Sequence, residues 1–176
     1  KDLVLRFSTE SDLNGGLSSV HRFYSSSARG HFYTISEGER NSLLLGGVWS
    51  YEGVAYRAFE KPAANTIPLY RFYSSSSKSH FFTTNAAERD ALKKGTVWRY
   101  EGIAYYVYSQ SAAGRIPVYR FWSLINKRHF YTTSEGEKNS LARNTSAWRY
   151  EGVAFYALPP PPAPVATSVH RFYSSS

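Results

Sequence analysis

Apolar and aromatic residues recur along this chain in the same order at intervals of 49 residues. Val20, Leu69 and Val118 each begin a five-residue segment in which apolar and aromatic side chains surround a central Arg. Such alternation predicts a half-buried β-strand. Another segment of this kind begins at Val169, so the pattern predicts three full repeats and the start of a fourth.

A second aromatic run follows each of these segments after a short polar turn. In the middle repeat the turn 74–79 is rich in Ser, and the run 80–84 reads His-Phe-Phe-Thr-Thr. Two apolar runs joined by so short a turn predict a β-hairpin. The hairpin tip carries a basic residue in every repeat, which we expect in solvent: Arg29, Lys78, and Lys127 with Arg128.

The third segment of each repeat has the start signal of a short helix. Ser36, Asn85 and Ser134 each lie three residues before a Glu, and these are Glu39, Glu88 and Glu137. In a capping box of this spacing the Ser or Asn side chain accepts from a helical amide, while the Glu reaches back to the cap amide. We expect one Leu per helix to provide the buried face: Leu43, Leu92 and Leu141.

The last segment of each repeat begins with Trp and contains Glu-Gly, at 49–56, 98–105 and 148–155. It predicts a strand whose Gly marks a bulge or a tight turn. The resulting boundaries are an N-terminal segment 1–19, repeats 20–68, 69–117 and 118–158, a Pro-rich linker 159–168 and an incomplete repeat 169–176.

One repeat has too little apolar surface to fold alone, so we expect 20–158 to act as one domain. The predicted fold class is mainly β with one short helix per repeat, in a closed pseudo-threefold, trefoil-like architecture. A fragment of a β-propeller and linear packing of the repeats are the alternatives.

The composition agrees with a folded β-rich protein. The 176 residues include 15 Tyr, 11 Phe and 4 Trp, and only 19% are charged. The sequence contains no apolar stretch long enough for a membrane span, and without Cys it has neither disulfides nor thiolate chemistry. The formal net charge of +8 predicts attraction to anionic partners such as cell-wall polymers, acidic glycans or nucleic acid, without choosing between them.

The combined motif is more specific than any of its parts. Tyr-Arg-Phe-Tyr, His-Phe-Phe-Thr-Thr, Ala-Glu-Arg and Tyr-Glu-Gly-Ile-Ala-Tyr, all within 70–105, resemble a family of repeat domains of unknown function in secreted bacterial and fungal proteins. The resemblance covers 20–158. It implies an extracellular accessory module, often attached to hydrolases, that binds carbohydrate or cell wall, and it brings no catalytic residues. The Ser runs 25–27 and 74–77 depart from the usual hairpin turn of that family.

Three polar residue types recur in register, in the sets Arg22-His31-Glu52, Arg71-His80-Glu101 and Arg120-His129-Glu151. In a structural interpretation, Arg pairs with Glu between strands and His donates to a backbone carbonyl. In a functional interpretation, each set helps to bind a sugar, which needs planar hydrogen-bonding partners and a flat aromatic face. The aromatic candidates are Tyr33, Tyr131, Trp49, Trp98 and Trp148.

Catalysis is not expected, because a glycosidase needs two carboxylates in different environments and repetition produces equivalent ones. Threefold closure could bring His31, His80 and His129 together as metal ligands, but no second ligand lies at metal spacing within a repeat, so we expect neither metal nor cofactor. We therefore predict a secreted, multivalent, lectin-like module that binds glycans or cell-wall polysaccharide. A nucleic-acid-binding protein, which we favour less, and a structural protein-interaction repeat are the alternatives. The oligomeric state stays open.

Overall fold

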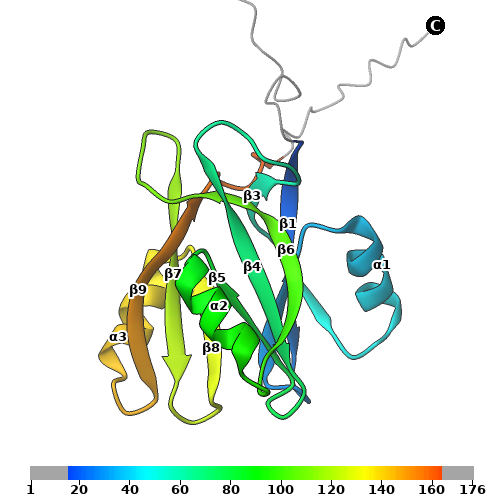
Figure 1. Ribbon diagram of the computed structural model, residues 1–176, viewed down its shortest axis with the longest axis vertical. Coiled ribbons are helices and arrows are strands. Elements are labelled where there is room, and N and C mark those ends of the chain that lie inside the picture. Colours follow the sequence, from blue (N-terminus) through cyan, green and yellow to red (C-terminus); the bar gives the residue numbers. More distant parts are fainter. Residues whose placement is uncertain (1–15, 164–176) are drawn as a thin grey trace, which may run out of the picture.

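The computed structural model describes residues 16–163, and this part of the chain forms nine strands and three helices (Figure 1). The order strand, strand, helix, strand occurs three times, and we call these groups unit 1 (17–59), unit 2 (66–108) and unit 3 (116–157). The elements are β1 (Leu17–Ser25), β2 (Gly30–Thr34), α1 (Glu37–Leu45), β3 (Ser50–Phe59), β4 (Thr66–Ser74), β5 (Ser79–Thr83), α2 (Ala86–Lys94), β6 (Arg99–Tyr108), β7 (Ile116–Ser123), β8 (Arg128–Thr132), α3 (Glu135–Arg143) and β9 (Trp148–Ala157).

Each unit begins with the predicted hairpin: β1 pairs with β2, β4 with β5 and β7 with β8, all antiparallel. The basic residue at the tip has a positive φ in every unit, 48° at Arg29, 49° at Lys78 and 54° at Lys127. These three side chains are exposed, as expected. Arg128 is half-buried instead, which contradicts the expectation that it lies in solvent.

The first strand of each unit also pairs with the last, and this ladder contains the predicted bulge. In unit 1, Arg22 lies opposite Gly53, and the register shifts on both sides of this pair. Gly53 has a φ of 96°, a backbone conformation that residues with a Cβ rarely adopt. The shifts recur between β4 and β6 and between β7 and β9.

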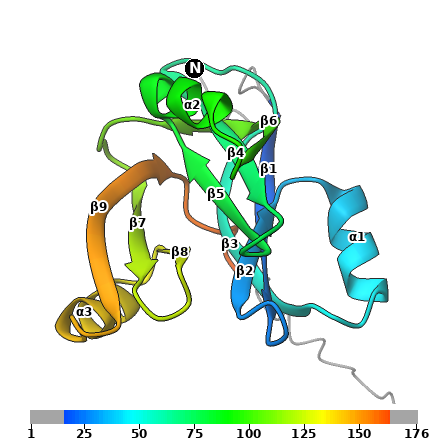
Figure 2. The ribbon, with the colours of Figure 1, turned by 60° about the horizontal axis from the view of Figure 1, so that its bottom comes forward.

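The helices begin as predicted, because the Ser36 side chain accepts from Glu39 N, Asn85 from Glu88 N and Ser134 from Glu137 N. None of the three helices has a buried residue. The expected buried leucines are therefore only half-buried, since each helix lies at the outside of the molecule (Figure 2).

The strands form one antiparallel sheet in the order β2-β1-β3-β6-β9-β7-β8, with β4 joined to β6 and β5 to β4. The fold is thus mainly β, as predicted. The sheet is open, so the closed trefoil-like architecture is not confirmed. Single residue pairs join the long strands of different units, Phe59 with Tyr106 and Tyr108 with Tyr156. Arg57 also pairs with Leu158, just after β9.

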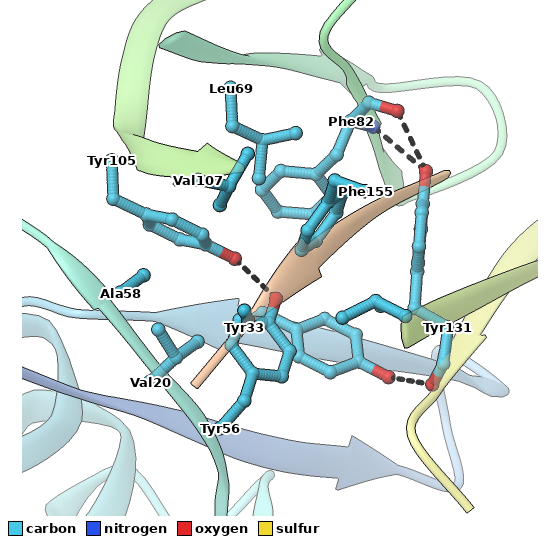
Figure 3. Close-up of a cluster of buried hydrophobic side chains, with 12 residues drawn as sticks. Val20, Tyr33, Tyr56, Ala58, Leu69, Phe82, Tyr105, Val107, Tyr131 and Phe155 are labelled. Carbon is cyan, nitrogen blue, oxygen red and sulfur yellow. Dashed lines mark hydrogen bonds between the residues drawn. The ribbon is translucent and has the colours of Figure 1, made fainter. Parts of the chain in front are cut away.

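The largest buried cluster takes side chains from all three units (Figure 3). Val20, Leu69 and Val118, the first residues of the repeated segments, are completely buried there. Strands β2, β5 and β8 face the middle of the molecule and contact one another (Figure 2). The incomplete repeat 169–176, most of the N-terminal segment 1–19 and the second half of the linker 159–168 lie outside the described residues.

Candidate functional site

The Arg, His and Glu that recur in the sequence come together in every unit. In unit 1, Glu52 Oε2 lies 2.8 Å from Arg22 Nε and 3.2 Å from His31 Nε2. The corresponding distances are 3.0 and 3.3 Å in unit 2 and 2.9 and 3.2 Å in unit 3. The Glu precedes the bulge glycine on the last strand, so the bulge helps to direct its carboxylate toward the Arg of the first strand.

Each of these Arg side chains also approaches a carboxylate of another unit. Arg71 Nη1 and Nη2 donate to Glu39 Oε2 and Oε1 at 3.2 and 3.1 Å. The other two contacts are longer: Arg22 Nη1 lies 3.7 Å from Glu137 Oε2, and Arg120 Nη1 lies 3.9 Å from Glu88 Oε2. Unit 2 therefore contacts unit 1, unit 3 contacts unit 2 and unit 1 contacts unit 3.

The helix glutamates thus have a role other than the predicted one. Thr34 Oγ1 donates to Glu39 and accepts from Ser36 N, so the cap amide is satisfied by a threonine and not by the glutamate. The same arrangement occurs in the other units. The reciprocal half of the capping box was therefore a wrong prediction, because the carboxylate turns toward Thr and the Arg of the next unit.

Arg71, Glu39 and Glu151 all stay ionised near pH 7, because their partners favour the charged forms. Burial opposes the charge of Arg71, but the hydrogen bond and charge of Glu39 outweigh burial and raise the Arg71 pKa. Burial likewise opposes ionisation of Glu39, and the hydrogen bonds from Arg71 and Thr34 lower its pKa. Burial also opposes ionisation of Glu151, but the hydrogen bond from Arg149 and the charge of Arg120 lower its pKa.

His31, His80 and His129 are neutral at pH 7 despite their Glu partners. Burial lowers the pKa of His31, and it lowers the pKa of His80 and His129 to about 4. A neutral ring that donates its Nε2 hydrogen to Glu leaves Nδ1 as an acceptor. The rings also pack on another unit: His31 on Phe130, His80 on Phe32 and His129 on Phe81, with centroids 4.6 to 5.0 Å apart.

The two candidate tyrosines line a cavity beside Arg22 and Glu52 but expose almost no surface to a ligand. Tyr33 and Tyr131 are each 3% exposed and belong to the core cluster. Tyr33 Oη donates to the Tyr131 carbonyl at 2.6 Å, and Tyr131 Oη bonds both the N–H and the carbonyl of Phe82 at 3.1 and 3.0 Å (Figure 3). Both side chains pack between the units, so their ring faces are not open for a sugar to stack on.

The three tryptophans remain accessible in part. Trp49, Trp98 and Trp148 are half-buried. Each ring lies 5.8 to 6.0 Å from the phenylalanine of its own unit's second hairpin strand, namely Phe32, Phe81 and Phe130. Each indole thus packs on its hairpin, and Trp148 and Trp49 also line the two cavities described next.

A cavity of about 280 Å³ lies at the junction of units 1 and 3. We call it the junction cavity. Its aromatic lining includes Tyr24, Phe130 and Trp148, and its polar lining includes Asn126, Glu137 and Ser140. Of the ligand-binding residues predicted from the sequence, His31, His129 and Trp148 line it. Tyr24, Asn126 and Ser140 were not predicted, and only Tyr24, matched by Tyr73 and Trp122, shows an aromatic pattern that could have indicated it.

A second cavity, of about 260 Å³, lies between the three hairpins, and we call it the central cavity. His31, His80 and His129 all line it, which is the convergence that the repeats suggested. Arg128 lines both cavities. Among residues 16–163, no group of three or more His, Cys, Asp or Glu side chains is arranged to hold a metal ion.

The family scan assigns most of the chain to one domain. The model of a domain of unknown function, DUF5648, matches residues 19–158. No curated protein and no solved structure matches the chain. None of the helices in the described part is long and apolar enough to cross a membrane. Since the match spans far more than half of its length, the chain belongs to the DUF5648 family.

Proposed function

We propose that this protein is a secreted, lectin-like module that binds glycans or cell-wall polysaccharide without catalysis. The junction cavity is the observation that carries the proposal. Its volume of about 280 Å³ is close to the lower end of the range of small-molecule pockets, roughly 300 to 1,000 Å³, which suits one or two sugar rings.

The lining of the junction cavity has both features that sugar recognition requires. Tyr24 and Trp148 supply aromatic surface for the apolar face of a ring. Asn126, Ser140 and Glu137 supply amide, hydroxyl and carboxylate groups for sugar hydroxyls. These groups come from a hairpin loop and a helix of unit 3, whereas Tyr24 comes from unit 1, so the packing of the two units creates the site.

Several sites per molecule form the second part of the proposal. Three further cavities at the junctions each contain one Arg of the repeated sets, namely Arg22, Arg71 and Arg120. The cyclic Arg–Glu and His–Phe contacts, together with the pairing of Arg57 with Leu158, support a pseudo-threefold arrangement of the units. Repeated weak sites on one surface would raise the affinity for a polymer by factors of about 10² or more.

The state of the carboxylates supports binding rather than hydrolysis. A glycosidase acid needs a carboxyl group with a raised pKa. Here Arg149 and Arg120 lower the pKa of the Glu151 carboxyl group, and Arg71 and Thr34 lower that of Glu39. Both groups are therefore ionised and paired near neutral pH.

A glycan array and a cell-wall pull-down test the proposal. Asn126→Ala should weaken binding, by about tenfold if the amide hydrogen-bonds the sugar. Ala28 occupies the equivalent position of unit 1, so the hairpin tolerates Ala there. Ser140→Phe should fill the cavity and abolish binding at this site.

Asn139→Phe is the matched control, because Asn139 is exposed on the same helix and does not line the cavity. It should bind like the parent protein. No binding to any saccharide or wall polymer at high protein concentration would overturn the proposal. Equal losses of binding in Ser140→Phe and Asn139→Phe would show that the sugar does not bind in the junction cavity.

A further inference from the structure

Arg128 breaks the equivalence of the three hairpins. It is the first residue of β8, and the corresponding first residues of β2 and β5 are Gly30 and Ser79. A Cβ built on Gly30 would lie 3.3 Å from Arg128 Nη1, so the missing side chain of unit 1 makes room for the guanidinium of unit 3. The long cation therefore occupies space that Gly30 leaves open.

The guanidinium of Arg128 has no partner within the described part of the protein. Its Nε and Nη1 atoms are shielded from solvent and donate no hydrogen bond. None of the ion pairs among residues 16–163 includes it. Burial lowers the Arg128 pKa, and the nearby charge of Arg29 lowers it further. Covered donors without an acceptor are costly for a protein, and the side chain is only half-buried, so an acceptor from outside can reach it.

The surroundings of Arg128 are positive. The central cavity is lined by Arg128 and Lys78 and by no carboxylate. Its three histidines are neutral near pH 7, because burial lowers their pKa. The junction cavity has one carboxylate, Glu137, which already accepts from Thr132 and lies near Arg22.

The geometry points to Arg128 as an anion-binding residue, which holds a carboxylate, sulfate or phosphate group of an acidic glycan seated in the junction cavity. This inference rests on the proposed function and specifies its ligand class. A guanidinium accommodates all three groups through paired N–H donors, which a neutral sugar cannot match. Because Arg128 lines both cavities, a ring between Tyr24 and Trp148 could direct its acidic group toward the central cavity.

Inorganic sulfate and phosphate are the first probes, with thermal unfolding measured against chloride at equal ionic strength. We expect both ions to raise the Tm of the parent protein and to leave the Tm of Arg128→Ser unchanged. Ser is the native residue at this position of unit 2, so the variant should fold. Arg143→Ser removes the same charge from an exposed site on α3 and should respond like the parent.

Oligosaccharides identify the source of the anion. Oligomers that carry uronic carboxylates, sulfate esters or phosphate esters are compared with a neutral oligomer of similar length by calorimetry. At least one acidic class should bind more tightly than the neutral one, and Arg128→Ser should lose about tenfold to a hundredfold in affinity for that class. Gly30→Ala keeps every charge but crowds the guanidinium, so it should lose part of this affinity.

The outcomes separate this inference from the proposed function. Equal binding of neutral and acidic oligomers, unchanged in Arg128→Ser, would overturn the anion site and leave the glycan-binding proposal standing. Arg128-dependent binding of simple ions without binding of any glycan would support the anion site and reject a glycan as its source. Arg128-dependent binding of an oligonucleotide in preference to every glycan would assign the site to nucleic acid and overturn the inference.

Discussion

The guanidinium of Arg71 in unit 2 holds the carboxylate of Glu39 in unit 1 through two hydrogen bonds of 3.2 and 3.1 Å. The equivalent contact between Arg120 and Glu88 is a single long one of 3.9 Å. Units 1 and 2 are therefore joined more tightly at this point than units 2 and 3, although the residues are the same.

Glu39→Gln should destabilise the protein more than Glu88→Gln. The first change removes a charge-assisted, bidentate pair, and the second weakens a long contact. Because 39% of the Glu39 side chain is exposed, solvent screens the pair, and we expect a loss of about 1 kcal/mol. Urea unfolding of both variants measures the difference. Equal losses would contradict the importance of the bidentate geometry.

The local elements could be predicted from the sequence because their signals are short-range. The hairpins follow from the alternation around Arg22, Arg71 and Arg120, and the helix starts follow from Ser36 and its counterparts. The bulge at Gly53 was also indicated by a glycine within a strand pattern. Each of these features depends on residues only a few positions apart.

The connections between units could not be predicted in this way. Nothing local to Glu39 indicates that its carboxylate turns toward Arg71, 32 residues later, while a threonine replaces it at the cap. Tyr33 reads as an aromatic residue on a strand, and only the packing of unit 3 against unit 1 places its hydroxyl in the core. Arg128 looked like a tip cation because the space beside Gly30 is a product of the assembled fold.

Tyr131→Phe should cost more stability than Tyr33→Phe. The hydroxyl of Tyr131 serves two buried groups, the N–H and the carbonyl of Phe82, whereas the hydroxyl of Tyr33 serves one carbonyl (Figure 3). Removing it leaves the Phe82 N–H without this partner, at a cost of about 1 to 3 kcal/mol, against about 1 kcal/mol for Tyr33→Phe. Thermal and urea unfolding test the order, and the reverse order would refute the assignment of these bonds.

The protein should lose stability on acidification through the partly buried histidines of the three Arg-His-Glu sets. The pKa of His129 is about 4 in the folded protein, below its ordinary value of 6.5. Between these values the unfolded chain takes up a proton that the folded chain does not. The free energy of unfolding therefore falls as the pH drops from about 6.5 to about 4. Below about pH 4 this ring changes the stability little. A shift of this size corresponds to about 3 kcal/mol.

His129→Gln tests this origin of the acid sensitivity. Gln can still donate to Glu151 but does not titrate, so the variant should lose less free energy of unfolding than the parent between pH 7 and pH 4.5. Urea unfolding at several pH values gives the two slopes. Parallel curves would show that other groups cause the acid sensitivity.

The bulge glycines should resist replacement although there is space around them. Gly102 has a φ of 99°, and a Cβ built there meets no atom within 4 Å. Gly102→Ala should nevertheless cost about 1 to 2 kcal/mol, because the strain lies in the backbone, and it should disturb the pairing of the neighbouring Glu101 with Arg71.

Gly38→Ala is the control, since this helical glycine has no positive φ and its Cβ would make an ordinary contact 3.6 Å from Ser36 Oγ. The free energy of unfolding of Gly38→Ala should rise by roughly 0.5 to 1 kcal/mol. A rise of similar size in Gly102→Ala would mean that the bulge does not need glycine to direct the Glu101 carboxylate. Urea unfolding measures both variants.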